Sequence, residues 1–135
     1  MSQDIHFEGL SLQPGVRVKV KGFIRAAAKL FRINLGKDNL NIGLHFNPRF
    51  DFFGDHNVIV CNSLKNGNWG PEQREYKFPF EDMRTVEVNF VFEEKQFRVT
   101  LPDGFEFTFP NRLELETIDF LSVHGDFYVR RVDFE

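Results

Sequence analysis

Residues 40–47 read Leu40-Asn41-Ile42-Gly43-Leu44-His45-Phe46-Asn47, and this stretch decides the fold class. Apolar residues occupy every second position, which is the pattern of a strand that is buried on one face only. Such a strand directs its apolar side chains to a core and its other side chains to the opposite face. We therefore expect a buried face formed by Leu40, Ile42, Leu44 and Phe46.

The same two-residue period runs through most of the chain. It recurs in residues 16–20, 31–35, 57–63, 86–92, 97–101 and 105–109. Turn sequences such as Pro14-Gly15 and Pro102-Asp103-Gly104 separate these segments. The alanine-rich segment 26–30 is too short to form a stable helix. Many short strands at regular spacing predict an all-β fold, a sandwich or jelly roll of antiparallel strands.

The composition is that of one globular domain. The chain has 135 residues, of which 41% are hydrophobic and 27% are charged, close to ordinary soluble proteins. We find no linker and no internal repeat, so residues 1–135 are expected to form a single domain. The formal net charge of −3 gives no electrostatic reason to expect nucleic acid or an anionic membrane as a partner.

Cysteine content and the amino terminus bear on the cellular address. The single cysteine, Cys61, allows no intrachain disulfide and is typical of a protein made in a reducing compartment. Residues 1–6 lack the basic and apolar regions of a signal peptide, and no apolar run approaches the ~20 residues of a membrane span. We expect a cytoplasmic protein without membrane insertion, for which a leaderless route to the outside stays open.

A row of polar side chains follows from the period of two. In an extended strand, His45, Asn47 and Arg49 point to the same face. Three hydrogen-bonding groups are thus aligned on the polar side of a strand. Pro48 lacks an N–H group, which favours a position at a strand end or edge.

Two further segments carry polar residues in alternation. In residues 57–63, Asn62 shares a face with Val58 and Val60, whereas Cys61 faces the core and is expected to be a buried thiol. After a turn rich in Asn and Gly, the only tryptophan, Trp69, is expected to open a short strand. In that strand Glu72 and Arg74 share a face by the same period.

Together these segments resemble the signature of the galectins, the β-galactoside-binding lectins. The resemblance rests on His45-Phe46-Asn47-Pro48-Arg49, Val60-Cys61-Asn62 and Trp69-Gly70-Pro71-Glu72-Gln73-Arg74, in this order and spacing. Further landmarks are Asn34-Leu35-Gly36-Lys37-Asp38, Phe78-Pro79-Phe80, Leu101-Pro102-Asp103-Gly104 and Phe109-Pro110-Asn111-Arg112-Leu113. The similarity therefore extends over essentially the whole chain.

The resemblance implies a jelly-roll β-sandwich of two antiparallel sheets with sugar bound on one face. It implies that His45, Asn47 and Arg49 hold the axial 4-hydroxyl of galactose and that Asn62 and Glu72 hold the 6-hydroxyl. Arg49, Glu72 and Arg74 would reach the neighbouring glucose or N-acetylglucosamine, and Trp69 would stack on the apolar face of the galactose ring. The implied partners are β-galactoside glycans on glycoproteins and glycolipids.

Each of these features also has a plain structural interpretation. The polar row could be an ordinary solvated strand face, Trp69 could belong to the core, and Glu72 with Arg74 could form a surface ion pair of little energetic value. A related alternative is a structural or protein-interaction member of the family, of the lens type, in which sugar binding is secondary. Such relatives usually lack one or more sugar contacts, and all of them are present here.

Other chemistry is poorly supported by the sequence. His6, His45, His56 and His124 have no metal-ligand spacing, and no motif for a nucleotide or another cofactor occurs. A glycosidase requires two carboxylates that flank the scissile bond, whereas Glu72 has no evident partner. We expect a protein that is not an enzyme and that needs neither metal nor cofactor.

Two features remain open at this level. The loop after Arg49 contains adjacent Phe52 and Phe53, which could pack into the end of the sandwich or form an apolar wall for a ligand or partner. Residues 6–10 and 127–132 both read as strands, and the resemblance places them near one edge of the sandwich. Exposed edge strands favour pairing across a two-fold axis, so we expect a homodimer with Ile5, Phe7, Val129 and Val132 as apolar contacts.

Overall fold

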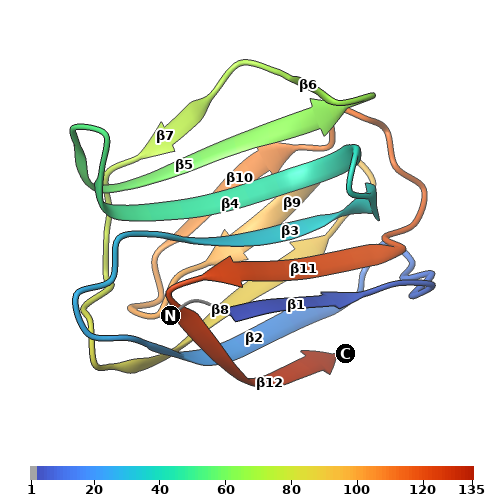
Figure 1. The fold of residues 1–135 in the computed structure, drawn as a ribbon. Coiled ribbons are helices and arrows are strands. Elements are labelled where there is room, and N and C mark those ends of the chain that lie inside the picture. Colours follow the sequence, from blue (N-terminus) through green and yellow to red (C-terminus); the bar gives the residue numbers. More distant parts are fainter. Residues whose placement is uncertain (1–2) are drawn as a thin grey trace.

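The computed structural model describes residues 3–135, which fold into two antiparallel β-sheets packed face to face (Figure 1). Met1 and Ser2, part of the amino-terminal stretch inspected for a signal peptide, lie outside the described residues. No helix long and apolar enough to span a membrane occurs among residues 3–135. The predicted all-β jelly-roll sandwich is confirmed.

The larger sheet carries the predicted polar row. Its order is β1 (Gln3–Phe7), β11 (Phe120–Gly125), β3 (Phe31–Asp38), β4 (Asn41–Phe52), β5 (Asp55–Lys65) and β6 (Asn68–Trp69), and β7 (Gln73–Glu75) also pairs with β5. The smaller sheet runs β10 (Glu106–Pro110), β9 (Gln96–Thr100), β8 (Thr85–Phe92), β2 (Arg17–Ile24) and β12 (Phe127–Phe134).

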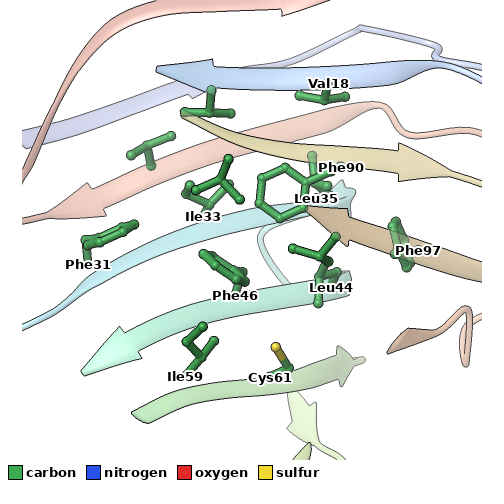
Figure 2. Close-up of a cluster of buried hydrophobic side chains, with 14 of the residues drawn as sticks. Val18, Phe31, Ile33, Leu35, Leu44, Phe46, Ile59, Cys61, Phe90 and Phe97 are labelled. Carbon is green, nitrogen blue, oxygen red and sulfur yellow. The ribbon is translucent and has the colours of Figure 1, made fainter. Parts of the chain in front are cut away.

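The core between the sheets is built largely from phenylalanine. Figure 2 shows Phe31 and Phe46 of the larger sheet and Phe90 of the smaller one within this core. Phe31 stacks on Phe127 of β12 with 4.6 Å between ring centroids, and Phe46 meets Phe90 edge-on at 5.3 Å. Because these pairs join opposite sheets, they bury large apolar areas with specific ring geometry. They thereby hold β3, β4 and β5 in place from the core side of the larger sheet.

A β-bulge in β4 overturns part of the predicted alternation. The register between β4 and β5 shifts between Ile42 and His45, so two consecutive residues there face the same side. A Cβ atom on Gly43 would lie 3.0 Å from the ring of core residue Phe97, which shows that Gly43 and not Ile42 faces the core. Ile42 is buried, but it lines a groove on the opposite face of the sheet.

Two other local predictions were wrong. Leu40 belongs to the turn between β3 and β4 and is 56% exposed, because the strand begins only at Asn41. Trp69 ends the two-residue strand β6 and does not open the strand that contains Arg74. Residues 70–72 connect β6 to β7. These two short strands pair with different parts of β5.

The two terminal strands form neighbouring sheet edges. β1 is the outer strand of the larger sheet and β12 the outer strand of the smaller sheet, and Figure 1 shows both on the same side of the molecule. The backbone N–H of Val129 donates to Oε1 of Gln3 at 2.6 Å, so the edges are in contact. β1 ends at Phe7; the predicted continuation of a strand to Leu10 was wrong.

Candidate functional site

A groove of about 570 Å³ lies on the face of the larger sheet that points away from the core. Its lining includes six of the seven residues that the sequence singled out, namely His45, Asn47, Arg49, Asn62, Trp69 and Glu72. Arg74 does not line the groove, but it contacts residues that hold the site together. The strands β4 and β5 supply most of the set because alternate residues share a face.

The ring of His45 is held by a chain of buried hydrogen bonds. Nδ1 of His45 lies 2.7 Å from Oδ1 of Asn34 on β3, and Nδ2 of Asn34 donates to Oγ of Ser122 on β11 at 3.0 Å. Because Asn34 presents its oxygen, His45 carries its proton on Nδ1 and directs the lone pair of Nε2 away from this contact. Neither Asn34 nor Ser122 was predicted to hold His45; the only signal in the sequence was their polar character within buried strands.

Burial keeps His45 neutral. The side chain is almost wholly covered, and burial, more than the positive charges of Arg32, Arg49 and His124, lowers its pKa to about 4. A buried imidazole loses the hydration of its charged form, so the neutral form is favoured. Near neutral pH His45 is therefore a hydrogen-bond acceptor at Nε2.

Pro48 determines how the side chain of Asn47 is used. The β3–β4 register places Pro48 opposite Phe31, between the pair Ile33–Phe46 and the bridge Leu30–Arg49. At that position a backbone N–H would bond the carbonyl of Phe31, and Pro48 has none. Nδ2 of Asn47 donates to the Phe31 carbonyl instead, at 2.8 Å.

The prediction that Pro48 lies at a strand end or edge was wrong. Pro48 lies inside β4, paired with Ile59 of β5, and not at a strand end or edge. Because Pro48 has no N–H, the hydrogen-bond ladder between β4 and β3 is interrupted at this one position. Asn47, only 2% exposed, fills that gap and is fixed in orientation by it.

Asp55 binds two arginines at one end of the groove. Nη1 of Arg49 lies 2.7 Å from its Oδ2, and Nη1 of Arg74 lies 2.9 Å from its Oδ1. Hydrogen bonds from Arg74 and Arg49 lower the pKa of Asp55. Arg74 also donates from Nε and Nη2 to Oε1 of Glu72, and its bonds to Asp55 and Glu72 raise its own pKa. The cluster remains charged and fixes the planes of both guanidinium groups.

Asn62 and Trp69 form the other part of the site. Nδ2 of Asn62 donates to the carbonyl of Gly70 at 2.9 Å, while its Oδ1 accepts from the N–H of Ser63 and from Arg112. Trp69 is 54% exposed and its ring centroid lies 4.7 Å from that of His45. The interpretation of Trp69 as a core residue is therefore wrong. Arg112 stood out in the sequence only as part of a family landmark. In the structure it orients Asn62 by its hydrogen bond to Oδ1.

Several polar groups of the groove have no partner among residues 3–135. They are Nε2 of His45, one N–H each of Asn47 and Asn62, Nη2 of Arg49 and Oε2 of Glu72. One acceptor, three donors and one carboxylate oxygen thus face a single groove beside an exposed indole. Within the same described part of the chain, no group of three or more His, Cys, Asp or Glu could hold a metal ion.

The family model described as galactoside-binding lectin matches residues 6–134. The chain is a galectin. Galectin-1 of Sus scrofa is 53% identical over 126 residues, which cover 93% of each chain. Among solved structures, the homodimeric agglutinin CG-16 from chicken liver superposes with a TM-score of 0.95 at 47% identity and covers 98% of this galectin and 100% of its own chain.

A third comparison concerns a ligand complex. The toad ovary galectin in complex with thio-digalactose has a TM-score of 0.94 and 40% identity, covering 98% of both chains. The likeness of the galectin to these proteins confirms the family that the sequence motifs indicated. It also agrees with the two-sheet sandwich observed here.

Proposed function

We propose that this galectin is a metal-independent, non-catalytic lectin that binds β-galactosides such as lactose and N-acetyllactosamine. Residues 1–135 would be its single carbohydrate-recognition domain. The observation that carries the proposal is the complementary hydrogen-bonding capacity of His45, Asn47 and Arg49. One acceptor and two donors come from residues that line the same groove, and a hydroxyl group both donates and accepts.

In this proposal the 4-hydroxyl of galactose donates to Nε2 of His45 and accepts from Asn47 and Arg49. The axial direction of this hydroxyl takes it down toward the sheet, whereas the equatorial 4-hydroxyl of glucose would miss the three groups. Each buried polar group left without a partner costs about 1–3 kcal/mol. Rejection of glucose therefore follows from the unpaired groups and needs no steric clash.

The remaining contacts follow from the other free groups. The second N–H of Asn62 and Oε2 of Glu72 are suited to the 6-hydroxyl, one as donor and one as acceptor. Trp69 would cover the face of galactose that presents C–H groups. Arg49 and Glu72 would reach the next sugar. We assign Arg74 chiefly the positioning of Glu72 through its two hydrogen bonds, and a direct sugar contact of Arg74 stays a prediction.

We also propose that the natural ligands are β-galactosides on glycoproteins and glycolipids and that two chains act together. The chicken liver protein of nearly identical fold is described as a homodimeric agglutinin, which supports this arrangement. Two sites on one particle cross-link glycans, because the second contact is made at high local concentration. The lens-type alternative is less well supported, since every motif residue is present and most line one groove.

Calorimetric titration with lactose and with cellobiose tests the proposal. The two disaccharides differ only at the 4-hydroxyl of the non-reducing sugar, so lactose should bind and cellobiose should not. Lactose should also change the emission of Trp69, the only tryptophan, in a saturable way. A folded protein that binds neither sugar, or both equally, would contradict the proposed function.

A matched pair of variants localises the site. Arg49→Ala removes a donor and one of the two ion pairs of Asp55, so lactose affinity should fall at least thirtyfold, about 2 kcal/mol. Arg98→Ala is the control, because Arg98 on β9 of the smaller sheet also contacts two carboxylates, those of Glu93 and Glu106. Equal lactose affinity in both folded variants would show that the groove is not the binding site.

A further inference from the structure

Two adjacent phenylalanines form the β4–β5 hairpin beside the groove. Phe52 pairs with Asp55, so Phe53 and Gly54 are the two residues of the turn. Phe52 lines the groove, and the guanidinium carbon of Arg49 lies 5.2 Å from its ring centroid. Phe53 meets Phe52 edge-on at 4.6 Å and is 93% exposed. These two residues, the hairpin phenylalanines, continue the groove as an apolar surface.

The backbone of Phe53 is strained. Its φ is 46° and that of Gly54 is 84°, the signs that a two-residue hairpin turn requires and that favour Asn-Gly. Among the non-glycine residues of positive φ in the part of the chain that the structure describes, Phe53 is the only aromatic one. An aromatic side chain here lowers stability and exposes apolar surface to water. A contact with a ligand is a physical reason to keep it.

Apart from Nη2 of Arg49, the polar groups of Arg49 and Asp55 next to the hairpin are already used. Both carboxylate oxygens of Asp55 accept from Arg49 and Arg74, and Nε and Nη1 of Arg49 are engaged with Asn47 and Asp55. Beyond Arg49 the groove wall therefore offers aromatic surface and little free hydrogen-bonding capacity. A ligand group in this place gains more from apolar contact than from hydroxyl groups.

We propose that the hairpin phenylalanines form a subsite for the apolar aglycone of a β-galactoside, the first part of the alkyl chain of a glycolipid. The inference rests on the proposed function. With galactose over His45 and Trp69 and the second sugar beside Arg49 and Glu72, the group attached to the second sugar lies next to Phe52. Its chain then crosses Phe52 toward Phe53.

The test compares methyl β-lactoside with octyl β-lactoside below its micelle concentration, by calorimetry. A few methylene groups partly covered by two rings should make the octyl compound bind about tenfold more tightly. In Phe53→Asn, which suits positive φ, this affinity ratio should fall to about two. Met83→Asn is the matched control, because Met83 is also exposed with positive φ but does not line the groove, and it should keep the ratio. Octyl β-maltoside should not bind.

The outcomes separate the two proposals. If methyl β-lactoside binds and the octyl compound gains nothing, or if Phe53→Asn keeps the full ratio, the aglycone subsite is wrong and the lectin function stands. If methyl β-lactoside does not bind to the folded protein, both proposals are wrong. If Phe53→Asn abolishes self-association in sedimentation without changing the ratio, the hairpin phenylalanines contact a second copy of the chain, which overturns the subsite.

Discussion

At the scale of single residues, the site depends on which atoms its neighbours leave free. Nε2 of His45 is an acceptor toward the groove because Nδ1 carries the ring proton and donates it in a hydrogen bond to Oδ1 of Asn34. Asn34 is oriented by its hydrogen bond to Ser122. Asn47 has one N–H for a ligand because the other is used by Phe31. The hydrogen-bonding role of His45 and Asn47 toward the groove is thus set by neighbouring residues.

The first prediction concerns pH. With its pKa near 4, His45 stays an acceptor down to about pH 5, so lactose affinity should be flat from pH 7 to 5 and fall as pH approaches 4. Nuclear magnetic resonance titration of the ring should follow the same midpoint. A loss of binding near pH 6.5 that accompanies protonation of His45 would contradict the assignment.

The same group contributes to stability with a definite sign. Because the folded-state pKa lies below the ordinary value of 6.5, the unfolded chain binds a proton between pH 6.5 and 4 that the folded protein does not. The free energy of unfolding therefore decreases as pH falls through this window, by up to about 3 kcal/mol from this group. Below about pH 4 the contribution of His45 no longer changes.

A second prediction tests the partner of His45. Asn34→Asp should raise the pKa of His45, because a carboxylate at Nδ1 favours the charged ring. The charged ring carries a proton on Nε2, so lactose affinity should become weaker at pH 6 than at pH 8. Asn39→Asp adds the same charge to the groove without a bond to His45. If both variants give the same pH profile, the hydrogen bond that Nδ1 of His45 donates to residue 34 does not govern the pKa of His45.

At the scale of elements, the hydrogen-bond ladder between β3 and β4 departs from regular pairing at two places next to the groove. Its interruption at Pro48 leaves the Phe31 carbonyl to Asn47, and the bulge around Gly43 turns Ile42 toward the groove. Both are departures from regular pairing in the strand that carries the polar row. Elsewhere β2 and β8 pair without a register shift.

The third prediction follows from this interruption. Pro48→Ala restores an N–H that competes with Asn47 for the Phe31 carbonyl, so lactose affinity should fall severalfold. The free energy of unfolding should change by less than about 1 kcal/mol, because the new hydrogen bond offsets the greater freedom of the unfolded chain. Pro110→Ala, on the outer strand β10, is the control. Unchanged affinity together with a protected amide at position 48 would contradict the mechanism.

The fourth prediction concerns β5, whose core face contains Cys61. The thiol is fully buried and burial raises its pKa, so the reactive thiolate is suppressed. Native protein should react with a thiol reagent only on the timescale of unfolding, and lactose binding should survive storage without reductant. Denatured protein provides the positive control for labelling. Rapid stoichiometric labelling of the native protein would show that Cys61 is accessible.

At the scale of the whole molecule, the neighbouring edges of β1 and β12 are the surface on which we predict self-association. Phe7, Val129 and Val132 are half-buried and pack against the core from this side, while Ile5 is half-buried outside the core cluster. A sheet edge with partly covered apolar residues is a surface that a second copy can complete. The predicted dimer contact thus lies on the terminal strands and not on the sheet face that bears the groove.

The fifth prediction tests this contact. Ile5→Lys places a charge on the β1 edge, so the protein should sediment as a monomer at micromolar concentration and fail to agglutinate red cells, with lactose affinity unchanged. Tyr76→Lys is the control, because Tyr76 is 71% exposed and lies on neither terminal strand. An Ile5→Lys protein that remains dimeric would exclude this edge as the interface.

The motif residues of the groove were predictable from the sequence, whereas most of its other lining residues were not. A period of two assigns His45, Asn47 and Arg49 to one face of a strand, because alternate side chains of an extended chain point the same way, and no register shift interrupts β4 between His45 and Arg49. The same argument placed Asn62 with Val60, and both line the groove. The alternation mispredicted Ile42, where a bulge shifts the register, and Leu40, which lies in a turn.

Only the tertiary structure decided how these residues act. The sequence alone determined the strand period, the single buried thiol and the motif that indicates the galectins. The tautomer of His45, the orientation of Asn47 and the support of Asn62 by Arg112 depend on residues 11, 16 and 50 positions away. Hydrogen bonds between such distant residues exist only once the strands are paired, because the sequence encodes side-chain direction locally but partners only through the fold.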